Sequence, residues 1–124
     1  MIFLLALAIA QPRTEVDFTK ILARKLEQTT RKPADLRKTL PDGRRVDIYH
    51  DGVAWEVELC SKWEESIGQS MGYAIGLNAT PGVWLLKRGM QDDEEYNQCL
   101  SVIAYLRGRG VTIEFRVTDI KELE

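Results

Sequence analysis

The chain has 124 residues, of which 44% are hydrophobic and 29% charged, a composition that is ordinary for one globular domain and argues against disorder. Its net charge of -2 hides an asymmetry, because residues 1–45 hold ten Lys and Arg against five Asp and Glu, whereas residues 46–124 hold seven against fourteen. Two cysteines are too few for a disulfide framework, and a single histidine largely excludes catalytic triads and histidine-based metal sites.

Residues 1–10 are apolar throughout and end in Ala8-Ile9-Ala10, which resembles the apolar core and cleavage site of a secretory signal. The segment is short for such a signal, no Lys or Arg precedes it, and ten residues cannot span a bilayer. Three interpretations stay open: a short or truncated export signal, the end of a longer signal, or a buried first strand or helix. The protein is accordingly expected either to be exported, to the periplasm or the medium, or else to be cytoplasmic.

A helix is predicted from residue 14 to residue 29, where Thr14 and Asp17 form a variant of the capping box at its start. The polar side of this helix and its exit are basic. These cations either form an ordinary solvated face or contact a polyanion such as nucleic acid. They are Lys20, Arg24, Lys25, Arg31 and Lys32.

The rest of the chain predicts a meander of strands followed by alternating helices and strands. The expected elements are strands at 36–40, 44–50 and 53–60, a helix at 62–77, a strand at 83–86, a helix that starts at the acidic residues 92–95, a strand at 111–117 and a charged tail at 118–124. Residues 14–124 are therefore expected to form a single α/β domain, with three α/β/α layers, a mixed sheet and the order αβββαβαβ.

The helix at 62–77 carries an apolar stripe that includes Ile67 and Ile75. Glycine recurs at every fourth position, at Gly68, Gly72 and Gly76, although each glycine should cost about 1 kcal/mol of helix stability relative to alanine. This spacing indicates close approach of another element. A polar stripe is also expected along the helix, formed by Lys62, Ser66, Gln69 and Tyr73.

Asp51-Gly52 is the strongest local signal in the chain, because this dipeptide favours the tight turn of a two-residue β-hairpin. With these residues as the loop, Asp47 lies opposite Glu56, and Glu58 lies further along the same side. The same register pairs His50 with Val53, Tyr49 with Ala54, Ile48 with Trp55 and Arg45 with Glu58, and it gathers Val46, Ile48, Trp55 and Val57 on an apolar face.

The facing carboxylates of Asp47 and Glu56 require an explanation, because like charges placed opposite each other destabilise a sheet. A good cross-strand pair contributes ~0.2–1 kcal/mol, and a repulsive pair costs a comparable amount. A divalent cation with oxygen ligands, a shared proton or the nearby Arg45 would each offset this repulsion.

The element order, together with Asp47, then Glu56-Val57-Glu58, then a helix carrying Gln69, resembles the PD-(D/E)XK nuclease superfamily, whose core is αβββαβ. The resemblance covers residues 14–88 and implies a restriction-endonuclease-like core. Arg45-Val46-Asp47, Glu56-Val57-Glu58 and residues 62–70 also look like a group of small, often exported, uncharacterised bacterial proteins assigned to this fold.

The resemblance implies roles for particular residues. Asp47 and Glu56 match the ligands of Mg²⁺ (or Mn²⁺), and Gln69 matches a helix glutamine that supports the site. Glu58 stands where the superfamily has a lysine that helps to activate water. Some members work with an acid at that position and others use a lysine from the next helix, where this chain has Lys62.

Two functions stay open at this point. The first is a Mg²⁺-dependent nuclease that hydrolyses the phosphodiester bonds of DNA. In it Glu58, Lys62 and Gln69 serve the chemistry, and Arg44, Arg45 and Tyr73 contact the nucleic acid. The second is a catalytically inactive nuclease-fold domain that binds nucleic acid or a protein partner, with Glu58 paired to Arg45.

Overall fold

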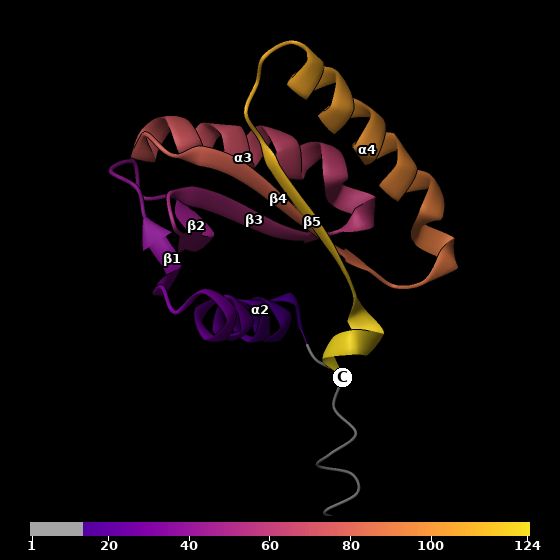
Figure 1. Cartoon of the computed structure of the whole chain (residues 1–124), viewed down its shortest axis with the longest axis horizontal. Coiled ribbons are helices and arrows are strands. Elements are labelled where there is room, and N and C mark those ends of the chain that lie inside the picture. The colour runs from indigo at the N-terminus through magenta and orange to yellow at the C-terminus, as the bar shows by residue number, and fades with distance from the viewer. Residues whose placement is uncertain (1–13) are drawn as a thin grey trace, which may run out of the picture.

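The computed structural model describes residues 14–124, so the apolar segment 1–10 and its interpretations lie outside the described residues. The described chain forms a five-stranded sheet with α2 on one face and α3 and α4 on the other (Figure 1), which confirms the three α/β/α layers. The elements are α2 (Glu15–Thr30), β1 (Ala34–Thr39), β2 (Arg45–His50), β3 (Val53–Leu59), α3 (Trp63–Leu77), β4 (Thr80–Lys87), α4 (Asp93–Gly108) and β5 (Glu114–Asp119).

The strands lie in the sheet in their sequence order, from β1 to β5. β1, β2 and β3 are antiparallel because short turns join them, whereas β4 and β5 run parallel to β3 because each follows a helical crossover. The sheet is therefore mixed, as expected. No helix within residues 14–124 combines the length and the apolar character needed to cross a membrane.

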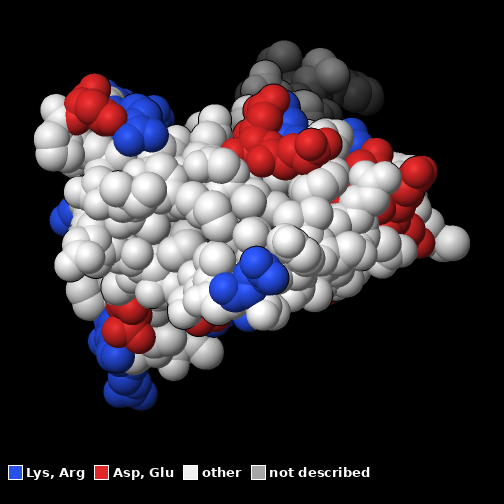
Figure 2. Space-filling view, turned by 90° about the horizontal axis from the view of Figure 1, so that it is seen from above, with Lys and Arg blue, Asp and Glu red and all other residues white. Residues whose placement is uncertain are grey.

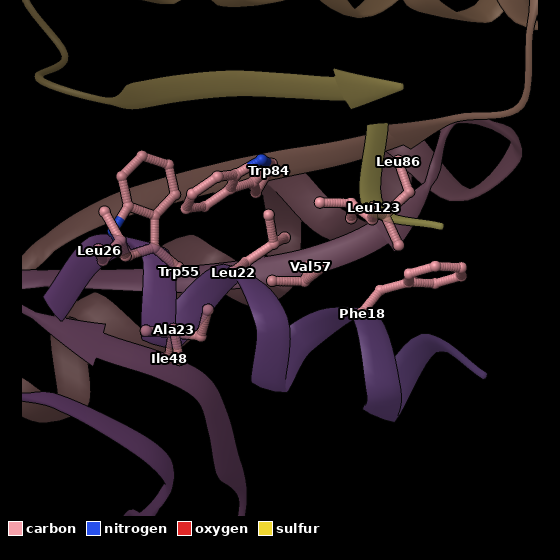
Figure 3. Packing of buried hydrophobic residues seen from close by; sticks show 10 residues of the cluster. All are labelled: Phe18, Leu22, Ala23, Leu26, Ile48, Trp55, Val57, Trp84, Leu86 and Leu123. Carbon is pink, nitrogen blue, oxygen red and sulfur yellow. The ribbon is translucent and has the colours of Figure 1, made fainter. Parts of the chain in front are cut away.

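The capping box predicted for α2 is present. The Asp17 N–H donates to Thr14 Oγ1 at 3.3 Å, and the Thr14 N–H donates to Asp17 Oδ2 at 2.9 Å. The helix then presents Phe18, Leu22 and Leu26 to the sheet, where they pack with tryptophans of β3 and β4 (Figure 3). The predicted basic residues from Lys20 to Lys32 are exposed, so the helix is polar and cationic on its outer side.

The other face of the sheet is covered by α3 and α4. Figure 2 looks onto this side, where charged side chains gather mainly towards the margins and few lie at the centre. Ile67 is buried, but Ile75 is 85% exposed, so its predicted place in the apolar stripe is wrong. The helix turns Ser66, Ser70 and Tyr73 inward instead, which also means that the predicted polar stripe is partly buried.

Two of the three helix glycines lie where the β1–β2 hairpin approaches α3. A Cβ on Gly72 would lie 2.9 Å from Arg44 Nη1, and a Cβ on Gly76 would lie 3.0 Å from Leu40 Cδ2. Gly68 faces open space, with nothing within 4 Å. The spacing predicts close approach of the helix backbone to a sheet or another helix, but the neighbours at these two positions are side chains from the turn of the hairpin.

The chain closes on the α2 side of the sheet. Val83 to Leu86 are buried on both faces of β4, as predicted. Residues 118–124 are not a simple charged tail, because Asp119 ends β5 and a short 3-10 helix follows over Ile120–Leu123. Leu123 is buried in the same core as the apolar side of α2, so the last turn of the chain contributes to the fold.

Candidate functional site

The hairpin register holds near the turn and fails beyond it. The predicted pairs of His50 with Val53, Tyr49 with Ala54 and Ile48 with Trp55 are all present. The ladder then stops, so the predicted pairs of Asp47 with Glu56 and of Arg45 with Glu58 do not form. Asp47 Oδ2 instead accepts a hydrogen bond of 2.8 Å from the Val57 N–H, and a side chain thereby replaces the backbone ladder.

The same irregularity moves Val46 to the other face of the sheet. Val46 packs with Leu40, Ala54 and Tyr73 on the α3 side, whereas Ile48 belongs to the core against α2. The predicted apolar face that joined Val46 to Ile48 is therefore wrong. A strict alternation of faces along β2 requires a regular backbone, and both ladders of β2 are interrupted at Asp47: the ladder with β3 ends at Ile48, and the ladder with β1 omits the pair of Arg37 with Asp47.

A cavity of about 340 Å³ lies between this point of the sheet and the start of α2. Four carboxylates from three elements line it: Glu15 from α2, Asp47 from β2, and Glu56 and Glu58 from β3. Trp55 and Val57 of β3 pack in the core against α2. The alternate residues of this strand, Glu56 and Glu58, line the cavity at the level where the ladder with β2 has stopped. Acids of β2 and β3 therefore meet an acid of α2 at the place where the backbone ladder has stopped.

The two β3 acids form the floor of the cavity. Glu56 is 6% exposed and Glu58 is 9% exposed. One oxygen of each side chain, Glu56 Oε2 and Glu58 Oε1, is buried without a hydrogen-bond partner in the structure. Buried polar atoms are normally paired, so unpaired carboxylate oxygens on two residues that line one cavity point to a missing partner, which is either a bound ligand or a proton shared with the neighbouring carboxyl of Asp47 or Glu15.

The electrostatics of this site raise the pKa values of its acids, and they favour the protonated form of Glu56 at neutral pH. Burial, followed by the negative charges of Asp47 and Glu58, raises the pKa of Glu56 to about 9. Burial and the neighbouring Glu15 carboxylate raise the pKa of Glu58 to about 7, although the charge of Lys62 acts in the opposite direction. Burial also raises the pKa of Asp47, against the Val57 N–H, which lowers it. A cation in the cavity would reverse this preference, because it stabilises the ionised carboxylates.

Three cations from three elements surround the acids. Lys20 comes from α2, Arg37 from β1 and Arg45 from β2, and all are exposed at the rim of the cavity. None of the ion pairs found among residues 14–124 joins one of these cations to an acid of the cavity, so the predicted pairing of Glu58 with Arg45 is not formed. The site combines an acidic floor with a basic rim.

The predicted site residues fall into two groups. Asp47, Glu56, Glu58 and Arg45 line the cavity. The others do not line it: they are Arg44, Lys62, Gln69 and Tyr73.

Each residue of the second group has its own surroundings. Lys62 is exposed at the start of α3, and Gln69 is exposed on that helix. Arg44 pairs with Asp42 at 2.7 Å and lies 5.5 Å from the centre of the Tyr73 ring. Burial raises the pKa of Tyr73, and the charges of nearby acids add to this effect.

Two charged residues of the cavity, Glu15 and Arg37, were not predicted. Glu15 lies in the first turn of α2, where an acid has an ordinary explanation in the helix dipole. Arg37 lies within a run of charged residues that resembles a solvated edge strand. The acidic first turn and the basic run were visible in the sequence, but neither pattern indicates that the two residues meet at one cavity.

The donor chemistry of the cavity fits a hard divalent cation, because carboxylate oxygens are the ligands that Mg²⁺ prefers. Within residues 14–124, however, no three His, Cys, Asp or Glu side chains are grouped so that they could hold a metal ion as they stand. An ion bound here would have to draw the carboxylates closer together. The unpaired oxygens of Glu56 and Glu58 provide the reason for such a change.

Comparisons with known protein families, with curated proteins and with solved structures found no match for this chain. The function therefore has to be inferred from the cavity itself.

Proposed function

We propose that this protein is a metal-dependent nuclease that hydrolyses phosphodiester bonds of DNA, built on a restriction-endonuclease-like core. One observation carries the proposal: four carboxylates line a single cavity whose rim carries three cations. A polyanion would be attracted by the rim, and a metal ion held by the acids would neutralise a phosphate that enters between them. The proposal accounts for a cluster of buried acids, which costs stability because like charges repel and because their burial removes them from water.

Asp47 and Glu56 would hold Mg²⁺ or Mn²⁺, with Glu58 or Glu15 completing the set of oxygen ligands. Such an ion supplies charge stabilisation at the phosphate and lowers the pKa of a bound water. The unpaired Glu56 Oε2 supports this role, because a buried carboxylate oxygen without a donor gains most from a cation.

Glu58 is the proton acceptor in this proposal. Its pKa of about 7 lies near neutral pH, where a general base combines a useful basicity with a populated ionised form. Glu58 lines the cavity and its Oε1 is buried without a hydrogen-bond partner, so the side chain would have to turn this oxygen towards the cavity to take the proton of an attacking water. Lys62 lies outside the cavity, and its part is to lower the pKa of Glu58 by its charge.

The competing function is a domain that binds nucleic acid without cutting it. It is favoured by the acid at position 58, where the resemblance places a lysine, and by the absence of a ready group of three metal-holding side chains within residues 14–124. In that case the basic rim would bind the nucleic acid without a metal ion in the cavity. Binding without hydrolysis is the outcome that identifies it.

The test is hydrolysis of plasmid and branched DNA with Mn²⁺. Wild type should cut, and Glu56→Ala and Asp47→Ala should not. Glu64→Ala is the matched control, because it removes an exposed acid from the first turn of α3, outside the cavity. Equal background cutting by wild type and Glu56→Ala would refute the nuclease function.

A second experiment tests metal binding in the absence of DNA. Mg²⁺ or Mn²⁺ should raise the thermal stability of wild type and of Glu64→Ala, because an ion that binds only the folded state stabilises it. It should have much less effect on Asp47→Ala. Thermal stability that neither metal changes in wild type would rule out the metal site.

A further inference from the structure

Arg37 has an unusual backbone for a residue in the middle of a strand. Its φ is 55°, in the left-handed region that costs a non-glycine residue about 1–3 kcal/mol. Leu36 pairs with Ile48 and Lys38 pairs with Val46 in one register without any inserted residue, but the pair of Arg37 with Asp47 between them is missing, so the unusual backbone coincides with a local break in the ladder. Strain of this kind persists only where the surrounding structure imposes it, and it is concentrated at functional sites.

The Arg37 side chain lines the cavity, together with the acids of the floor. Its neighbour Lys38 does not line the cavity, since its Nζ lies 4.9 Å from the centre of the Tyr49 ring. Two adjacent cations of β1 therefore have different surroundings. Burial raises the pKa of Asp47, and the charge of Arg37 is one of the influences that lower it, so the guanidinium acts electrostatically on the acidic site.

The β3 residues that line the cavity are Glu56, Val57 and Glu58, so this strand offers no cation to a bound anion. A guanidinium from another strand is well suited to supply that charge, because its planar fork donates two parallel hydrogen bonds to phosphate oxygens and stays charged at any physiological pH. Arg37 enters the cavity from the edge strand β1, next to β2 and Asp47.

We propose that Arg37 is the phosphate-binding residue of this cavity and supplies from β1 the positive charge that the β3 lining of the cavity lacks. This assignment deepens the proposed function and rests on it, since the phosphate is that of the DNA backbone. The left-handed backbone is then the conformation that directs the guanidinium to the phosphate. Arg45 and Lys20 add to the attraction at the rim without such a constraint.

The test compares wild type with Arg37→Gly, Arg37→Lys and the control Lys38→Ala. Arg37→Gly removes the guanidinium and also relieves the backbone, because glycine adopts positive φ without a penalty. Arg37→Lys keeps the charge but loses the fork, and Lys38→Ala removes a neighbouring cation that lies outside the cavity. Each protein is measured for urea unfolding, for binding of a labelled DNA duplex in Ca²⁺ over a series of salt concentrations, and for kcat and KM in Mn²⁺.

Arg37→Gly should unfold no more easily than wild type and yet bind the duplex about tenfold more weakly, as expected for the loss of one charge-assisted contact. The slope of log affinity against log salt should fall by about 1. KM should rise in the hydrolysis assay. Arg37→Lys should restore the slope and part of the affinity, and Lys38→Ala should stay close to wild type.

The outcomes separate Arg37 from the nuclease function. If wild type cuts DNA and Arg37→Gly has the same KM and salt slope, the role of Arg37 is refuted and the nuclease stands. If Arg37 governs binding but no protein cuts, the role of Arg37 stands and hydrolysis is refuted. A wild type that neither binds nor cuts refutes both. A loss of binding in Arg37→Gly that follows a loss of folded protein would show a structural role, and would overturn the assignment.

Discussion

Glu56 shows how one residue can connect stability to function. Its carboxyl is buried at the floor of an acidic cavity, with one oxygen unpaired, and burial raises its pKa to about 9. At neutral pH without metal, the folded protein therefore keeps a proton that the unfolded chain releases. A cation would displace that proton, so the same carboxyl is an acid in the free protein and a ligand in the bound one.

The sign of the pH dependence follows from this raised pKa. Below pH 4.5 the Glu56 carboxyl is protonated in both the folded and the unfolded state. Between that pH and about 9 only the unfolded chain ionises, so the free energy of unfolding falls as pH rises, by up to about 1.4 kcal/mol per pH unit for this group. Urea unfolding of metal-free protein at pH 5, 7 and 9 should show this decline.

Glu56→Gln provides the matched comparison. The amide cannot ionise, so this variant should lose much less stability between pH 5 and pH 9 than wild type and should be the more stable protein at the upper end. Added Mg²⁺ should stabilise wild type increasingly as pH rises, because ionised carboxylates bind it. Parallel stability curves for the two proteins would contradict the assignment of the raised pKa to Glu56.

At the scale of elements, α3 is shaped by the hairpin that packs on it. Its glycines follow one spacing but meet different surroundings, since Gly68 faces open space and Gly76 lies against the buried side chain of Leu40. The same four-residue spacing of glycine therefore corresponds to two different surroundings along one helix, open space at Gly68 and a packed side chain at Gly76. Only the packing of the hairpin distinguishes them.

The comparison of Gly68→Ala with Gly76→Ala tests this difference. Gly68→Ala should raise the free energy of unfolding by about 0.5–1 kcal/mol, because alanine restricts the unfolded chain and clashes with nothing. Gly76→Ala should gain less or lose stability, since its Cβ would meet Leu40 Cδ2 at 3.0 Å. Equal gains in urea unfolding would show that the hairpin does not restrict α3.

At the scale of the whole molecule, the two ends of the described chain share one core. Phe18 and Leu22 of α2 pack in the cluster that also holds Leu123 from the last turn. This contact joins residues about a hundred positions apart and closes the layer that carries Glu15. The position of α2, and with it one wall of the cavity, therefore depends in part on the final residues of the chain.

Leu123→Ala should destabilise the protein by about 2–4 kcal/mol, because it removes a buried leucine side chain and leaves a cavity. Glu122→Ala is the control, since that residue is exposed in the same turn and should stay within about 0.5 kcal/mol of wild type. Chemical unfolding monitored by tryptophan fluorescence measures both. A small effect of Leu123→Ala would show that the last turn does not hold α2.

The sequence by itself determined the order of the elements, the capping of α2, the Asp51-Gly52 turn and the burial of β4. These features follow from local preferences and from the period of apolar residues, which act within a few positions along the chain. The same reasoning found Asp47, Glu56 and Glu58, because acids at matched places in a hairpin stand out from an apolar pattern.

Only the tertiary structure decided what those acids surround. The ladder between β2 and β3 stops after Ile48, Val46 turns to the other face, and the cavity gains Glu15 and Arg37 from elements that no local pattern connects to it. Where the ladder stops, the backbone N–H of Val57 donates to the Asp47 carboxylate in place of a backbone carbonyl. A register argument assumes that backbone pairing continues along the whole strand, and here the pairing is interrupted at Asp47 on both sides of β2.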